Sequence, residues 1–132
     1  MKDISIYFNP LISLGDFDED KIGKAIDGFY GDNFPLLEKG GVALLFVPEF
    51  RGDKKVNVNL TTENFRTSFY NLNIGVDWKL PLYDLGNILP GNDLKDTYFA
   101  LSQVVAELVK KEIIPLIIGG SQDLTMALYK GY

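Results

Sequence analysis

The sequence predicts an α/β sandwich built on a mainly parallel sheet, and three observations support this. Short apolar runs alternate along the chain with amphipathic segments of helical period. The apolar runs are continuous, which is typical of strands covered on both faces, as in parallel sheets. The chain has 132 residues, 46% of them hydrophobic, so residues 1–132 are expected to form a single domain.

Four apolar runs are interpreted as strands, each bounded by glycine, proline or asparagine. The clearest runs from Val42 to Val47 between Gly41 and Pro48. The segment 49–59 reads as a loop, although alternation over 56–60 also allows a short strand. The predicted strands cover residues 4–8, 42–47, 80–85 and 113–118.

Four amphipathic segments are interpreted as helices. The clearest covers 94–112, where apolar residues recur at intervals of three and four. The segment 16–30 begins with acidic residues, which favour the positive end of a helix dipole. A helix from Thr61 or Thr62 to Asn71 is expected to turn three residues inward, namely Phe65, Phe69 and Leu72. The last helix, 122–130, is expected to be capped by Ser121.

Composition excludes much familiar chemistry. With no Cys and no His, the chain has no disulfide, no thiolate nucleophile and no Ser–His–Asp triad. The net charge of −5 argues against nucleic acid or an anionic membrane as a partner. The longest apolar run, 42–47, is far shorter than the roughly 20 residues of a membrane span. A cytoplasmic location is therefore expected.

The acidic run over residues 16–20 suggests a calcium-binding loop, but the residues that follow it do not have the spacing of an EF-hand. An EF-hand needs Gly at its sixth position and Glu at its twelfth. Counted from Asp16, those positions hold Lys21 and Asp27. A solvated helix start is the favoured interpretation.

Two glycine-containing turns follow predicted strands and are candidate sites. The amides after Gly119-Gly120 are placed to bind an anion or nucleotide at a helix start, or they simply form a tight turn. Leu124 occupies the place of the third glycine of a dinucleotide fingerprint. Asp84, before Gly86, either points into a ligand crevice or satisfies loop amides.

Two other residues have ordinary structural interpretations. Arg66 lies within an apolar helical pattern, where a salt bridge or a surface position is expected. Trp78 is expected to serve packing rather than ligand binding.

Residues 80–125 resemble the ureohydrolase superfamily of arginases, agmatinases and formimidoylglutamases. Leu-Pro-Leu-Tyr-Asp-Leu-Gly at 80–86 is similar to that family's strand ending in Asp-x-Gly. After the long helix, Ile-Pro-Leu-Ile-Ile-Gly-Gly-Ser-Gln-Asp-Leu-Thr at 114–125 resembles its strand running into Gly-Gly-Asp-His-Ser. Weaker likeness extends over about 41–132, and the formimidoylglutamase branch is the most similar.

The resemblance implies a three-layer αβα sandwich of arginase-like fold and a binuclear manganese site. In that family, metal-activated water attacks the carbon of a guanidinium or formimino group. Gln122 stands where the family has the histidine that is its first metal ligand, and Asp123 follows it. A neutral amide oxygen is a poorer manganese ligand than imidazole, so a weakened or lost metal position is expected at Gln122 and Asp123.

The chain is shorter than the family's domain and lacks its later Asp- and His-rich motifs. It is therefore expected to be the N-terminal part of a ureohydrolase-like protein, with 1–40 as a family-specific extension. By itself it is expected to hold no cofactor and to be inactive, while a complete parent uses manganese on a small linear amidine.

Two alternative functions stay open, and self-association of the chain is expected. One alternative is a degenerate homologue with a structural or regulatory role, and the other is an anion-binding module. A shortened parallel sheet exposes an unpaired edge, so self-association through that edge is expected.

Overall fold

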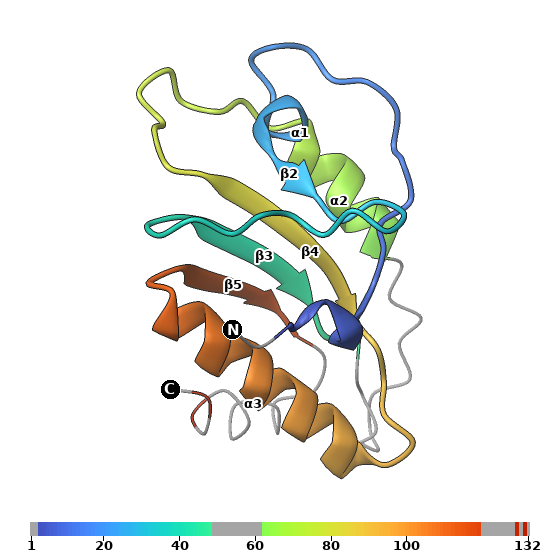
Figure 1. Ribbon diagram of the computed structural model, residues 1–132. Helices are drawn as coiled ribbons and strands as arrows, with labels where there is room; N and C mark the ends of the chain where they lie inside the picture. Colours follow the sequence, from blue (N-terminus) through green and yellow to red (C-terminus); the bar gives the residue numbers. More distant parts are fainter. Residues whose placement is uncertain (1–2, 49–61, 120–128, 130, 132) are drawn as a thin grey trace.

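The computed structural model describes residues 3–48, 62–119, 129 and 131. Within them, a five-stranded sheet has the order β1-β4-β3-β5, and β2 pairs with β4 beside this path (Figure 1). Strands β2, β3, β4 and β5 are parallel, and β1 alone is antiparallel. The strands are β1 (Phe8–Asn9), β2 (Asp27–Gly28), β3 (Val42–Phe46), β4 (Leu82–Ile88) and β5 (Ile114–Ile118).

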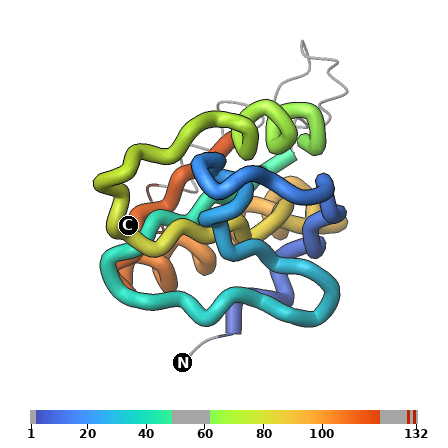
Figure 2. The backbone as a smooth tube through the Cα atoms, turned by 90° about the horizontal axis from the view of Figure 1, so that it is seen from above, coloured from blue at the N-terminus to red at the C-terminus, as the bar shows by residue number. Residues whose placement is uncertain are grey.

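Helices lie on both faces of this sheet. Helix α3 (Leu94–Lys110) covers one face, and helix α2 (Thr62–Tyr70) covers the other together with the short helix α1 (Ile22–Ala25). Seen from above, the lighter-blue segment that contains α1 and the green α2 lie in front of the sheet, and the orange α3 lies behind it (Figure 2). The predicted α/β fold class with a mainly parallel sheet and three layers is confirmed.

The main core lies between the sheet and α3. Ala43, Leu45 and Val47 point to this side from β3 and the residue after it, and Leu85 points there from β4. They meet a stripe of buried α3 residues, namely Ala100, Leu101, Val104, Val105 and Leu108. Helix α3 begins with a capping box, in which the side chains of Asp93 and Asp96 each accept a hydrogen bond from the other residue's backbone amide.

The predicted elements from residue 42 onward agree with the structure within a few residues. Strand β4 ends at Ile88 rather than at residue 85, and α3 ends two residues before the predicted end. The predicted loop 49–59 lies outside the described residues, and so does the predicted helix 122–130 apart from Tyr129, which is helical.

The predicted helix over 16–30 is wrong. Only Ile22–Ala25 is helical there, and Asp27–Gly28 forms the strand β2. Gly28 lies in β2, and glycine is unfavourable inside a helix. A Cβ at Gly23 or Gly28 would also overlap an aromatic ring, Phe17 at the first and Tyr30 at the second. Residues 4–8 also differ from the predicted strand, since η1 (Ser5–Tyr7) is a 3₁₀ turn and only β1 is extended.

Two burial predictions are also wrong. Leu72 is exposed, whereas Phe65 packs its ring against the buried Phe46 of β3 and stays partly exposed. The sequence predicts that strand β5 is buried, yet Ile114 and Leu116 are exposed. The described helices do not cover β5 on the α2 side of the sheet.

No helix within the described part of the chain has the length and apolar character needed to cross a membrane.

Candidate functional site

Gln122 and Asp123, the predicted metal position, lie outside the described residues, as do Gly120 and Ser121. The metal and anion hypotheses at this turn therefore stay predictions. Asp84 and Arg66, by contrast, are described and lie together in the molecule.

The polar cluster under α2 is built on a bulge in β4. The register of β3 and β4 shifts between the pairs Leu44–Asp84 and Phe46–Asn87, so β4 has one extra residue there. Gly86 lies within this bulge with a φ of 91°, a left-handed conformation that glycine adopts without strain. Residues three apart in a regular strand point to opposite faces, but the bulge turns both Asp84 and Asn87 toward α2.

Asp84 is fully buried and accepts four hydrogen bonds. Arg66 donates from Nε to Oδ2 at 2.8 Å and from Nη2 to Oδ1 at 3.0 Å. The Tyr70 hydroxyl donates to Oδ2 at 2.5 Å, and the Gly86 amide donates to Oδ1 at 3.0 Å. A carboxylate offers about four lone-pair positions, so these partners saturate it.

Arg66 is held by several partners besides Asp84. Its Nη1 donates to Asn87 Oδ1 at 2.8 Å, and the Asn87 amide donates to Thr62 Oγ1 at 3.1 Å. The guanidinium carbon lies 4.2 Å from the centre of the Phe46 ring. The bidentate pair and the ring contact together fix the position of α2 on the sheet.

The phenols beside this ion pair stay protonated. Burial and the adjacent Asp84 carboxylate raise the pKa of Tyr70 far above its usual range. Burial also raises the pKa of Tyr30, which outweighs the lowering effect of its hydrogen bond with Tyr70. Tyr70 is therefore a hydrogen-bond donor at every ordinary pH and is unsuited to act as a base.

The two interpretations of Asp84 can now be decided. Its carboxylate accepts from the backbone amide of Gly86, which lies in the bulge of β4 rather than in a loop, and no lone pair is left for a ligand. Arg66 forms the predicted salt bridge, buried rather than on the surface. The sequence reasoning missed Tyr70 and Asn87. The polar spacing of Thr62, Arg66 and Tyr70, four residues apart on one helix face, was an available signal.

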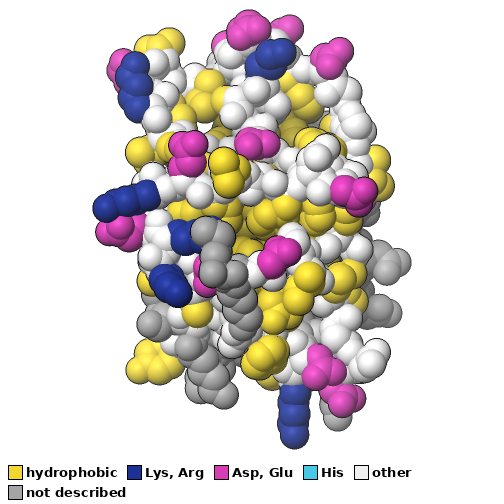
Figure 3. Space-filling model, viewed as in Figure 1, with side chains coloured by type: hydrophobic (Ala, Val, Ile, Leu, Met, Phe, Trp, Pro, Cys, Tyr) yellow, Lys and Arg dark blue, Asp and Glu magenta, His cyan; other side chains and the backbone are white. Residues whose placement is uncertain are grey.

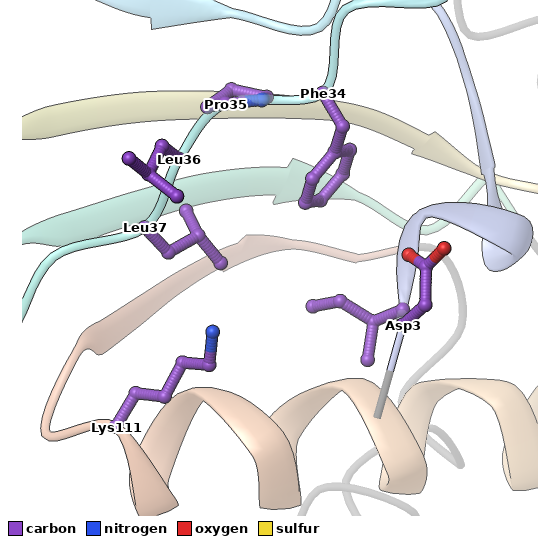
Figure 4. Close-up of a pocket in the computed structure, with 7 residues that line it drawn as sticks. Asp3, Phe34, Pro35, Leu36, Leu37 and Lys111 are labelled. Carbon is purple, nitrogen blue, oxygen red and sulfur yellow. The ribbon is translucent and has the colours of Figure 1, made fainter. Parts of the chain in front are cut away.

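The hollows among the described residues are lined mainly by apolar side chains. One of about 170 Å³ lies on the α3 side, between residues 34–37 and Lys111 (Figure 4). At its edge, the Asp3 carboxylate already accepts two hydrogen bonds from Ser5, which lower its pKa. In the side view of Figure 3, hydrophobic side chains form a band across the middle of the molecule.

Two further hollows lie on the α2 side, at the amino end of β4. One of about 600 Å³ extends along Glu19, Trp78 and Leu80, and one of about 290 Å³ adjoins it near Phe69 and Leu116. Ligands of parallel sheets gather beyond the carboxyl ends of the strands, so these hollows are at the end opposite to the expected crevice.

A binuclear metal site does not fit the described residues. Among them, no group of three or more His, Cys, Asp or Glu side chains could hold a metal ion. Asp84 has saturated oxygens, and its nearest cation is a guanidinium.

Comparison with known proteins shows the fold. No family model matches the sequence. No curated protein matches it either. The crystal structure of formimidoylglutamase from Bacillus subtilis subsp. subtilis str. 168 superposes with a TM-score of 0.66 at 21% sequence identity. The match covers 91% of this chain and 39% of that chain, so this chain spans less than half of its structural neighbour. The chain thus has a ureohydrolase-like fold over the matched part.

Proposed function

We propose that this chain is the N-terminal part of a hydrolase that cleaves C–N bonds of linear amidines, within the formimidoylglutamase-like branch of the ureohydrolases. The observation that carries the proposal is the superposition on a formimidoylglutamase over 91% of the chain. The sequence likeness over residues 80–125 supports it independently, because it falls on β4, α3 and β5 in the expected order.

The chain alone is proposed to be inactive. A ureohydrolase uses manganese to generate its nucleophilic water, and the described residues do not supply a ligand set for it. Gln122 replaces the family's first histidine ligand, and the match leaves most of the neighbour's chain without a counterpart. The cluster of Asp84, Arg66 and Tyr70 is proposed to hold α2 in place rather than to react.

A direct assay tests this proposal. The purified chain is incubated with Mn²⁺ and a formimidoyl amino acid, arginine or agmatine, and release of formamide or urea is followed. The expected rate equals that of Mn²⁺ alone, because no complete ligand set is present. Manganese-dependent turnover by this chain would refute its inactivity.

A longer protein that contains this sequence tests the activity proposed for the parent. A product that carries this sequence followed by Asp-x-His-x-Asp and Asp-x-Asp motifs is expected to hydrolyse one of these amidines with Mn²⁺. Failure of such a product on all three compound classes would count against the proposed enzyme.

Gln122 also favours a second candidate, a pseudoenzyme with a structural or regulatory role. The two candidates differ in the parent's later motifs, which would be lost in a pseudoenzyme. In a longer product, Gln122→His combined with Ser121→Asp restores Gly-Gly-Asp-His. An enzyme with a weakened metal position would then bind Mn²⁺ more tightly in calorimetry, whereas a pseudoenzyme without the later ligands would not change.

A further inference from the structure

Strand β5 lies at an open edge of the sheet. It pairs with β3 on one side, and no strand of the described residues pairs with its other side. At the opposite end of the sheet, the two-residue strands β1 and β2 already occupy the far edge of β4. The long edge left for another strand is therefore that of β5.

The backbone of this edge is suited to a partner strand. The Ile114 amide donates to Gly41, so alternate residues of β5 face β3 and the others face outward. Pro115 removes the donor at the start of the edge, but its carbonyl and both backbone groups of Ile117 point away from β3. Open edges in native sheets are commonly protected by charged side chains, and residues 113–118 contain none.

The side chains of β5 give the same indication. Ile114 is 60% exposed and Leu116 is 41% exposed on the α2 side, although both belong to a parallel sheet. Strands of parallel sheets are normally covered on both faces. A strand added beside β5 would bring further chain over these two apolar side chains.

The last described residues show on which face of the sheet the chain continues after β5. Tyr129 and Gly131 are helical, and Gly131 is buried. A Cβ at Gly131 would lie 2.8 Å from the carbonyl oxygen of Ser102 and 2.7 Å from Cβ of Val105, both in α3. Val105 belongs to the core between α3 and the sheet, so Gly131 lies beside α3 on the same face.

The handedness of crossovers then fixes a direction. Helix α3 carries the chain from β4, past β3, to β5. Connections between parallel strands of one sheet are almost always right-handed. Two crossovers of the same hand that use the same face move the chain in the same direction across the sheet. A parallel strand that follows the helical residues around Gly131 is therefore placed beyond β5, on the open edge.

We propose that the later part of the parent protein extends the sheet beyond β5 with at least one further parallel strand, which pairs with the outward groups of Pro115 and Ile117. This inference rests on the proposed function, because it requires a parent longer than this chain. The structural neighbour is consistent with it, since the match leaves most of that protein's chain without a counterpart here.

Hydrogen exchange of single amides tests the added strand, in this chain and in the longer product described above. The Ile117 amide is expected to exchange rapidly in this chain and to be strongly protected in the longer product. The Ile114 amide is the internal reference, because its bond to Gly41 is present in both. Equal exchange of Ile117 in the two products, whether fast or slow, overturns the inference.

This measurement is independent of activity. A longer product that hydrolyses an amidine while Ile117 stays unprotected keeps the proposed function and overturns the added strand. A protected Ile117 in an inactive product supports the strand and counts against the enzyme.

A substitution provides a second test. Leu116→Lys is expected to change the thermal midpoint of this chain little, because the side chain is partly exposed, and to lower that of the longer product by roughly 5 °C or more, because the charge becomes buried. The matched control is Leu36→Lys, at an 82% exposed leucine on the α3 side, which should change neither midpoint. A Leu116→Lys effect of the same size in both products contradicts the proposed coverage of β5.

Discussion

Asp84 is a carboxylate with no exposed surface, and its neighbours compensate for that burial. Removal of an ion from water costs several kcal/mol, which attraction offsets only when geometry is good and every lone pair is satisfied. Arg66 supplies a bidentate pair, Tyr70 and Gly86 supply the remaining donors, and Phe46 covers the guanidinium. The buried charges are therefore stable only while all of these partners are present. Removal of one side chain leaves its partner buried and unpaired.

Asp84→Asn is expected to destabilise the chain strongly. The substitution leaves the Arg66 guanidinium buried without its counter-charge, which typically costs roughly 3–5 kcal/mol. Urea unfolding followed by circular dichroism measures the change. Asp27→Asn is the control, because Asp27 is an exposed strand residue and its substitution should stay within about 0.5 kcal/mol. Equal stability of the two variants would contradict the role given to Asp84.

Tyr70→Phe is expected to lower stability by roughly 1.5–3 kcal/mol near neutral pH, because a hydrogen bond to a charged group is lost. The effect depends on pH. The pKa of Tyr70 is raised in the folded state, so its contribution is complete below the unfolded pKa of about 10 and declines as pH rises above it. Unfolding free energies measured from pH 8 to 11 should therefore fall more steeply for wild type than for Tyr70→Phe. Parallel pH profiles would contradict this.

At the scale of elements, the sequence predicts well where one signal dominates. Helix α3 has a long uninterrupted stripe of apolar residues and appears almost at its predicted bounds. The segment 16–30 also has apolar residues at helical spacing. It contains Gly23 and Gly28, however, and each glycine costs about 1 kcal/mol in a helix interior. The pairing of Asp27–Gly28 with β4 is a tertiary interaction that local periodicity does not contain.

The polar cluster shows a second limit of sequence reasoning. The alternatives open for Arg66 and for Asp84 include contacts of the kind that the structure shows, but no local signal predicts that the two residues pair with each other. Their meeting depends on one extra residue in β4, and Gly86 was predicted to end that strand rather than to lie within it. A bulge reverses which residues share a face, and a single glycine is too weak a signal to predict one.

Gly86→Ala is expected to disrupt this element. Its φ of 91° is unfavourable for a residue with a Cβ, and the added carbon would overlap the carbonyl oxygen of Asn9 in β1. Backbone strain of this kind costs of order 1–3 kcal/mol before the overlap is counted. Gly75→Ala is the control, because its Cβ would meet no atom within 4 Å. Thermal unfolding should show a large fall for the first variant and little change for the second.

At the scale of the whole molecule, β4 joins the N-terminal segment to the rest of the fold. β1 and β2 both pair with β4, while β3 pairs with it from the other side. Ile4, Phe8 and Phe29 belong to the same core as α3. Gln122 and Asp123 lie outside the described residues. The weakened metal position there, which is the sequence feature most informative about function, therefore stays a prediction.

Removal of residues 1–40 tests whether this segment is a separable extension. The deletion takes away two strands beside β4 and the core side chains Ile4, Phe8 and Phe29. We expect residues 41–132 to lose cooperative thermal unfolding and the near-ultraviolet dichroism of packed aromatic residues.

A point variant tests the same segment without a large deletion. Phe8→Ala should lower the unfolding free energy by roughly 3–5 kcal/mol, the usual cost of truncating a buried aromatic residue. Ile12→Ala is the matched control, because that side chain is 67% exposed. If residues 41–132 unfold cooperatively near the wild-type midpoint, and Phe8→Ala behaves like its control, the N-terminal segment is an extension that the fold does not need.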